Sequence, residues 1–253
     1  MIHYKLAEQL HFNYVNAHPF PHIVIDNFLD KGIATKASND LIKYDKWDYD
    51  PTSHSSIAQI NKFFSPGPPQ DVVYMENEAR TAWQVLQFLN SPIAISYLEK
   101  LTGIQGLIPD PTFTGGGYHK IKKGGKLAIH ADYNLHPETK LHRRLNVLVY
   151  LNQNWREEWG GHLELWNKEL TECTHKILPI LNRAVIFNIT DQAYHGHPEP
   201  LNCPEDQARL SIALYYFTHD RPDTEKSHEH AAVWYFPEEK SQTENLDELF
   251  SIS

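Results

Sequence analysis

The stretch ARLSIALYY, residues 208–216, alternates strictly between two kinds of side chain. Successive side chains of a β-strand point to opposite faces of the sheet, so this stretch predicts a strand with two different faces. The two faces are Leu210, Ile212 and Leu214 on one side, and Arg209, Ser211 and Ala213 on the other. A guanidinium on the inner face of a barrel strand is costly without an anion partner. The stretch therefore predicts both a barrel strand and an anion-binding position.

This strand is the last of several short, β-rich segments that follow residue 117. Gly-Gly pairs or clusters of Pro and Asn separate most of them, which is typical of strands joined by turns. The segments are 118–121, 126–130, 145–151, 162–166, 173–178, 184–189 and 210–218. Several short strands at nearly regular spacing favour a sandwich or barrel over alternating βαβ units.

The first hundred residues are predicted to be mainly helical. Two apolar stripes at helical spacing each need an apolar surface to cover. The stripes are Leu29, Ile33, Ala37 and Leu41 in the first helix, and Ala82, Val85, Leu86 and Leu89 in the second. A third helix is expected between Ser91, which suits an N-cap, and Gly103, which suits the position after the C-cap. Residues 46–75 are rich in Ser, Pro and Asp and are interpreted as loop.

The sequence contains no internal repeat and no linker that would mark a domain boundary. We therefore expect a single domain over residues 1–253, with helical support in 1–103 and a β core in about 113–218. Residues 219–253 form a polar tail, apart from the segment Ala231–Phe236, which is expected to dock back on the body.

Composition excludes several classes of protein. Of the 253 residues, 41% are hydrophobic, which suffices for a core, and the formal net charge of −9 disfavours nucleic acid or an anionic membrane as the main partner. No apolar run approaches the ~20 residues that span a bilayer, and no continuous apolar run typical of a secretory signal precedes residue 21. Two cysteines make no disulfide framework, so a cytoplasmic location is expected.

Histidine is frequent, with 16 in the chain, and the sharpest local pattern is His130-Ala131-Asp132. Residues two apart in a strand share a face, so this imidazole and this carboxylate can share a cation. Chance alone gives roughly one His-x-Asp in a chain of this composition, so the pattern is weak by itself. A 2-His-1-carboxylate triad also needs a distant histidine on a facing strand, and His195 and His197 are candidates.

In order along the chain, these pieces resemble the iron(II)- and 2-oxoglutarate-dependent oxygenases, in the branch of the prolyl 4-hydroxylases. The resemblance covers about 100 of the 253 residues, from about Tyr118 to Phe217, and residues 19–29 also resemble the start of many such proteins. The matching pieces are His130-x-Asp132, residues 143–152, Trp155 with 160–165, residues 179–187, His195, and Arg209-x-Ser211. The implied fold is α+β, a double-stranded β-helix (a jelly-roll, cupin-like core) with the N-terminal helices packed on the outside of the sheet.

The resemblance implies a role for each matching residue. The iron ligands would be His130, Asp132 and His195. Arg209 would hold the distal carboxylate of 2-oxoglutarate, and Tyr150 would donate its hydroxyl to the same carboxylate. Two further cosubstrate residues are expected, namely Ser211 and Tyr118.

The spacing of the second histidine leaves an alternative. Fourteen residues separate His195 from Arg209, which is longer than is usual in this branch, whereas twelve separate His197 from Arg209. Both histidines face the same way in an extended segment, so His197 is the alternative distal ligand.

The implied cofactor is Fe(II), with 2-oxoglutarate as cosubstrate and O₂ as oxidant. Oxidative decarboxylation releases succinate and CO₂, and the expected outcome is hydroxylation of an aliphatic C–H. The implied substrate is a prolyl or other amino-acid residue or a small molecule. Arg143 lies about where prolyl hydroxylases keep an arginine near the peptide, and the neighbouring Arg144 leaves the register open. Asp132→Ala is expected to abolish turnover and leave the fold intact.

Two alternative hypotheses come from other functional classes. A non-catalytic β-sandwich ligand-binding protein would need neither an iron triad nor a buried arginine. A cupin-type, redox-inert metal enzyme would have more histidines close together on one strand pair and no use for Arg209. The oligomeric state stays open in all three hypotheses.

Overall fold

The computed structural model describes residues 4–49, 59–65, 77–110, 113 and 115–236. Among these described residues, four α-helices lie in the N-terminal part, and the remaining elements are mainly strands. The helices are α1 (Tyr4–Val15), α2 (Lys31–Lys43), α5 (Arg80–Leu89) and α6 (Pro92–Thr102), and two 3₁₀ turns are η1 (Glu157–Trp159) and η2 (Asp223–Glu225). The strands are β1 (His22–Ile25), β2 (Asp48–Tyr49), β3 (Gln59–Ser65), β4 (Ile108–Pro109), β5 (Gly117–Ala131), β6 (His142–Tyr150), β7 (Leu163–Trp166), β8 (Cys173–Ile177), β9 (Ala184–Asn188), β10 (His195–His197), β11 (Ala208–Thr218) and β12 (Val233–Tyr235).

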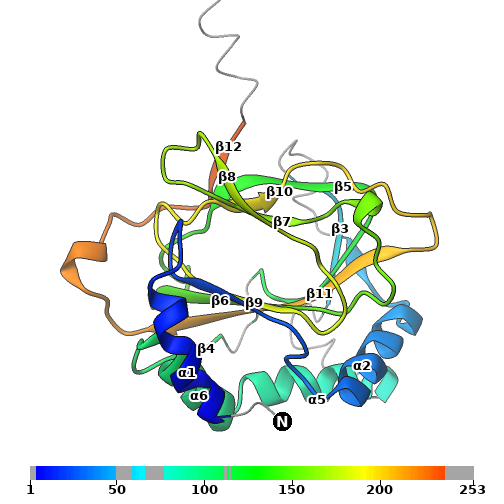
Figure 1. Cartoon of the computed structure of the whole chain (residues 1–253), viewed down its shortest axis with the longest axis horizontal. Helices are drawn as coiled ribbons and strands as arrows, with labels where there is room; N and C mark the ends of the chain where they lie inside the picture. The colour runs from blue at the N-terminus through cyan, green and yellow to red at the C-terminus, as the bar shows by residue number, and fades with distance from the viewer. Residues whose placement is uncertain (1–3, 50–58, 66–76, 111–112, 114, 237–253) are drawn as a thin grey trace, which may run out of the picture.

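The strands form one antiparallel sheet that curls into a jelly roll, as the sequence predicts (Figure 1). The hydrogen-bonded order is β1-β9-β6-β11-β5-β10-β7-β8. The long strand β5 connects two layers of the sheet, one made of β1, β9, β6 and β11 and the other of β10, β7 and β8. Residues 117–122 of β5 pair with β11, whereas residues near its end pair with β10. The change of partner falls around Gly124-Gly125, where Gly124 has a φ of +74°, a conformation that favours glycine.

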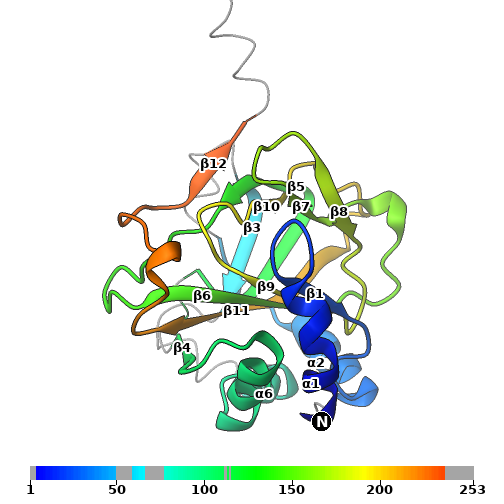
Figure 2. The same cartoon turned by 60° about the vertical axis from the view of Figure 1, so that its left-hand side comes forward.

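The helices pack against the layer that contains β9, β6 and β11, below the barrel in Figure 2. The predicted alternation of β11 is confirmed, because Leu210, Ile212 and Leu214 lie in the same apolar core as the helices. The second predicted stripe is also buried there, and so are Val147 and Val149 of β6. One core therefore joins the N-terminal helices to the outer face of this layer.

The first predicted helix differs from its prediction at two residues of the stripe, Leu29 and Ile33. Asp30 caps α2 by accepting hydrogen bonds from two backbone N–H groups, so Leu29 precedes the helix. Ile33, predicted on the buried stripe, is 43% exposed. The buried face is instead Ala34, Ala37, Ser38 and Leu41.

Two segments predicted as irregular contain strands. The interpretation of 46–75 as loop is wrong at β2 and β3, which pair with each other, while residues 50–58 and 66–75 lie outside the described residues. In the polar tail, the apolar segment docks on the body as expected, because β12 adds to the edge of β5. In the described part of the chain, no helix has the length and apolar character needed to cross a membrane.

Candidate metal centre

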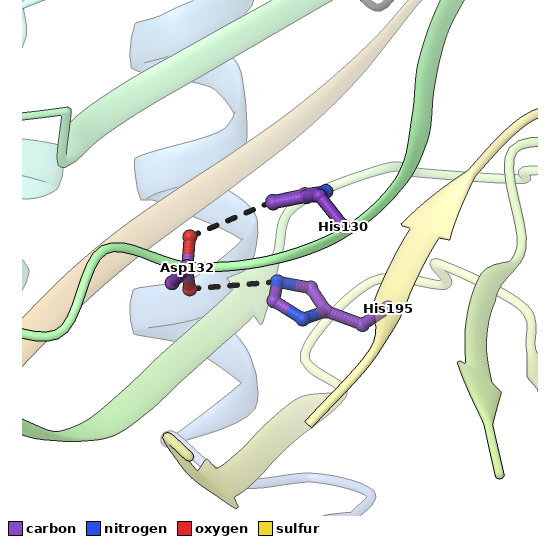
Figure 3. A group of neighbouring side chains, drawn as sticks. All are labelled: His130, Asp132 and His195. Carbon is purple, nitrogen blue, oxygen red and sulfur yellow. Dashed lines mark ion pairs between the residues drawn. The ribbon is translucent and has the colours of Figure 1, made fainter. Parts of the chain in front are cut away.

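Two strands bring the predicted metal ligands together. His195 of β10 lies directly opposite His130 of β5, and Asp132 follows the end of β5 by one residue. Each of the three residues offers a ligand atom, and these atoms all lie within 4.8 Å of one another (Figure 3). The Asp132 carboxylate lies 3.5 Å from His130 Nε2 and 3.6 Å from His195 Nε2. The three side chains therefore converge on one point.

The backbone fixes which ring nitrogen each histidine presents. His130 Nδ1 lies 2.9 Å from the carbonyl oxygen of Ala128, and His195 Nδ1 lies 2.9 Å from that of Ala193. A carbonyl only accepts hydrogen bonds, so each Nδ1 carries the proton and each Nε2 lone pair is directed to the shared point. Burial lowers the pKa of His195 to about 4, so this imidazole is neutral and able to ligate at pH 7.

Asp132 is ionised because cationic and hydrogen-bonding groups surround it. Burial raises its pKa, but Arg143 and the two histidines outweigh burial and hold the pKa well below its usual range. Arg143 Nη2 lies 2.9 Å from Asp132 Oδ2, and Asn146 Nδ2 donates to the same oxygen at 3.0 Å. With Oδ2 occupied in this way, Oδ1 is the oxygen nearest to His130. Two neutral imidazoles and one carboxylate are the donor set of non-haem Fe(II) sites, so these residues fit the metal.

Arg143 lies deeper than the sequence suggests. Its side chain is 1% exposed and stacks between two aromatic rings, 3.6 Å from the Tyr215 ring centroid and 4.4 Å from that of Tyr133. Its Nη2 also donates to Asn146 Oδ1 at 3.2 Å. Arg143 is therefore a partner of the metal-site carboxylate, rather than a group presented on the surface for a peptide.

Arg209 is a buried cation without a carboxylate partner. Its side chain is 5% exposed, and in the described part of the chain no carboxylate oxygen lies within 4.0 Å of its guanidinium. Its Nε donates to the carbonyl of Gly161 at 2.8 Å, and its Nη2 donates to the Tyr150 hydroxyl at 3.2 Å. Burial lowers the pKa of this guanidinium, which nevertheless stays charged at neutral pH. An uncompensated buried cation of this kind fits an anionic ligand.

The Arg209 side chain rests on a glycine that no other residue can replace without displacement. Gly161 has a φ of +72°, and a Cβ built on it would lie 2.5 Å from Leu201 Cδ2 and 3.0 Å from Arg209 Cδ. Both the backbone conformation and the close approach require glycine here. Gly161 therefore positions the guanidinium.

Of the other predicted cosubstrate residues, two lie with Arg209 and one does not. Tyr150 and Ser211 are directly opposite each other on β6 and β11, so both face the barrel interior. Tyr118 is opposite Ile212 instead, and it lies in the core under the helices, where burial and the charge of Asp40 raise the pKa of its hydroxyl. The structure thus places Tyr118 outside the predicted cosubstrate pocket.

The metal triad and Arg209 face the same interior. Phe187 contacts the His195 ring at a centroid distance of 4.7 Å, and it belongs to the same apolar cluster as Tyr150.

Of the two candidate histidines, His195 joins His130 and Asp132 in the described residues, whereas His197 lies opposite Leu127. Between them, Gly196 approaches β5 so closely that a Cβ would lie 2.6 Å from the Ala128 carbonyl oxygen.

Residues 116–217 match the model of the 2OG-Fe(II) oxygenase superfamily. The β core of this chain is therefore that of a 2OG-Fe(II) oxygenase. The family uses Fe(II) and 2-oxoglutarate, which agrees with the donor set of the triad and with the buried arginine. Both alternative hypotheses, a non-catalytic binding protein and a redox-inert cupin-type enzyme, are therefore wrong. No curated protein matches the whole sequence at a significant level.

Solved structures share the fold of this oxygenase. A prolyl hydroxylase of Trichoplax adhaerens, in complex with a hypoxia inducible factor oxygen degradation domain peptide fragment, aligns with a TM-score of 0.60 at 21% identity, over 85% of this chain and 90% of that chain. A prolyl-4-hydroxylase of Pseudomonas putida aligns with a TM-score of 0.55 at 14% identity, over 84% and 99%. The epimerase SnoN, in complex with Fe³⁺, alpha ketoglutarate and nogalamycin RO, aligns with a TM-score of 0.52 at 13% identity, over 92% and 96%.

Sequence reasoning missed two residues of this site. Asn146 is a polar residue in phase with Tyr150 within the otherwise apolar residues 145–150, which is a signal for an inward hydrogen bond. Trp234 packs on the His130 ring, at a centroid distance of 4.7 Å. Its only sequence signal is an apolar segment within a polar tail, which predicts docking but not where the segment docks.

Proposed function

We propose that this oxygenase hydroxylates an aliphatic C–H with iron held by His130, Asp132 and His195, and that Arg209 anchors the distal carboxylate of 2-oxoglutarate. The observation that carries the proposal is the buried Arg209, which has no carboxylate partner among the described residues and faces the same interior as the triad. Iron held by these residues would supply the oxidant for the C–H from O₂, with conversion of 2-oxoglutarate to succinate and CO₂. The side chains of the protein bind and orient the metal and the cosubstrate.

The protein residues bind, orient and exclude water. The two histidines present neutral Nε2 atoms, and Asp132 supplies the single negative charge of the ligand set. The Tyr150 hydroxyl accepts from Arg209, which leaves its own proton to donate to the cosubstrate carboxylate. Ser211 stands opposite Tyr150 and can add a hydrogen bond to the same group. Apolar residues around Tyr150 keep this end of the barrel dry, which strengthens the ion pair.

For the substrate, we infer a prolyl or other amino-acid residue of a peptide, or a small molecule. The Trichoplax adhaerens structure holds a peptide and the SnoN structure holds nogalamycin RO, so one fold accommodates both kinds. We place the enzyme in the cytoplasm, because Cys173 and Cys203 are both free. A nucleic-acid partner is not expected for a chain with a net charge of −9. We treat the helices and the barrel as one functional unit, since they share one core.

The test compares two histidines on the same strand. Mn²⁺ binding to the full chain is measured by the decrease of the free-ion EPR signal, for wild type, His195→Ala and His197→Ala. Both histidines are buried, so the two variants carry similar packing losses. We expect His195→Ala to lose Mn²⁺ binding and succinate formation, and His197→Ala to retain both. The reverse ranking would move the ligand to His197, and unchanged binding in both variants would refute the triad.

The same assay identifies the substrate. Succinate formation from 2-oxoglutarate is screened against peptides and free amino acids, and mass spectrometry detects a product heavier by one oxygen atom. A substrate whose product lacks the added oxygen, while succinate still forms, would show an outcome other than hydroxylation.

A further inference from the structure

The C-terminal strap, defined here as residues 227–235, lies against both segments that carry the triad. At one end of the strap β12 pairs with β5, with Trp234 directly opposite His130. Directly opposite residues of an antiparallel pair share a face, so the indole lies on the same side as the imidazole. The two ring centroids are 4.7 Å apart, with an interplanar angle of 31°.

His130 is enclosed on both sides by aromatic rings. On the side away from Trp234 lies His195, at a centroid distance of 4.5 Å. The Nδ1 of His130 is held by the Ala128 carbonyl. With two ring neighbours and one hydrogen bond, the imidazole has little freedom to rotate away from Asp132, and Trp234 supplies one of these constraints.

The rest of the strap is anchored beside the other two ligands. Asn134, two residues after Asp132, makes three hydrogen bonds with the strap. Its Nδ2 donates to Ser227 Oγ at 2.8 Å and to the His228 carbonyl at 2.7 Å, and its Oδ1 accepts from the His230 backbone N–H at 3.0 Å. Asn134 is 3% exposed, so these bonds are shielded from water.

A further contact ties the strap to the segment before β10. His230 Nε2 lies 3.0 Å from Asp191 Oδ1, four residues before His195. The strap therefore contacts the chain just after Asp132, at His130 itself, and just before His195. Figure 2 shows β12 running along the edge of β5 at the upper rim of the barrel.

We propose that the C-terminal strap is part of the metal site, with Trp234 and Asn134 as positioning residues that hold the triad in its ligating geometry. The inference rests on the proposed iron ligands and adds a new element to them. Linkage makes the effect reciprocal: if strap docking strengthens metal binding, metal binding must strengthen strap docking by the same factor. The strap is thus coupled to the metal, although it contributes no ligand.

Two measurements on the full chain test the coupling without relying on turnover. The first is Mn²⁺ affinity by EPR for Trp234→Ala, Trp234→Phe and Asn134→Ala. Loss of one aromatic pair is expected to weaken Mn²⁺ binding about two- to tenfold in Trp234→Ala, and Trp234→Phe should restore most of it because a ring remains. Asn134→Ala should weaken binding about tenfold, as outer-shell hydrogen-bond changes typically do.

The matched control is Asn167→Ala. Asn167 also makes three hydrogen bonds within its loop, to Thr171 and Glu172, but that loop joins β7 to β8. Asn167→Ala should bind Mn²⁺ as the wild type does. If it weakens binding as much as Asn134→Ala, the effect is general destabilisation, and the inference is wrong. Thermal melts of all variants accompany the titrations.

The second measurement is amide hydrogen exchange of the wild type with and without Mn²⁺. Slower exchange in residues 227–235 on metal addition, with unchanged exchange in the β7–β8 loop, supports the coupling. Two results would overturn this inference while leaving the triad in place. One is wild-type Mn²⁺ affinity in Trp234→Ala and Asn134→Ala, and the other is amide exchange in the strap that does not change on metal addition. Absence of Mn²⁺ binding in the wild type overturns the triad and the strap inference together.

Discussion

Replacement of Arg209 by Ala is the sharpest perturbation of the cosubstrate site. The guanidinium is 5% exposed and, within the described residues, meets only neutral acceptors, the Gly161 carbonyl and the Tyr150 hydroxyl. A dicarboxylate bound there would form a buried charge pair, and truncating one partner of such a pair costs about 2–5 kcal/mol. At 1.4 kcal/mol per tenfold, the dissociation constant of 2-oxoglutarate should rise roughly 30- to 4,000-fold.

The assay is calorimetric titration of 2-oxoglutarate into the Mn²⁺-loaded chain without O₂. Arg156→Ala is the control, because this arginine is exposed, pairs with Glu158 at 3.6 Å and lies over the Trp159 ring, so its loss should leave the affinity unchanged. Pyruvate, which lacks the distal carboxylate, should bind weakly to the wild type and gain nothing from Arg209. An Arg209→Ala enzyme with wild-type affinity for 2-oxoglutarate would refute the anchor and require another cation.

Three further predictions concern the metal site, stability and architecture. Asn146→Ala removes a hydrogen bond to Asp132 and should weaken Mn²⁺ binding about 10- to 100-fold by EPR titration, whereas unchanged affinity would contradict this role. Burial lowers the pKa of His22, so the unfolded chain takes up the proton more readily than the folded chain. The contribution of neutral His22 to stability is therefore present above the unfolded pKa of about 6.5 and is lost as the pH falls. In urea melts, His22→Asn should flatten the rise in unfolding free energy between about pH 5 and pH 7.5. Deletion of residues 1–102 exposes the core shared with the helices and should give an aggregating fragment by size-exclusion chromatography; a monomeric fragment that still turns over 2-oxoglutarate would show that the barrel is independent.

Strand faces could be predicted from the sequence because a period of two leaves only two choices. The alternation in β11 assigned Leu210 and Arg209 to opposite faces, and the structure agrees. Helix faces were less certain. The stripe in α2 included Ile33, which is exposed, and omitted Ser38, whose hydroxyl donates to the Leu151 carbonyl at 2.7 Å. A buried serine satisfied by a distant carbonyl is invisible to a hydrophobic pattern.

The register between strands is the information that the sequence lacked at the site. Tyr118 resembles a cosubstrate residue by position, but pairing with β11 sets it opposite Ile212 and turns it to the helix side. A shift of one residue would have placed it inside the barrel. The Trp234 contact likewise depends on pairing between residues about one hundred positions apart, which no local pattern encodes.

Two buried arginines of the barrel, Arg143 and Arg209, show why pairing decides function. Both are nearly inaccessible to solvent, but their charged partners differ. Arg143 already has a carboxylate, Asp132, at 2.9 Å, so its charge is compensated within the protein and supports a metal ligand. Arg209 has only neutral partners among the described residues, so its compensating charge has to arrive with a ligand.

This difference changes how the metal ligand should be probed. Asp132→Ala was expected to leave the fold intact, but it would leave Arg143 buried without its partner, and breaking a buried pair costs about 3–5 kcal/mol. Lost turnover in that variant would then report unfolding as well as lost metal. Asp132→Asn keeps the side-chain volume and an oxygen that accepts from Arg143, while it removes the anionic ligand. The asparagine variant therefore separates the two roles of Asp132, as a metal ligand and as the counter-charge of Arg143.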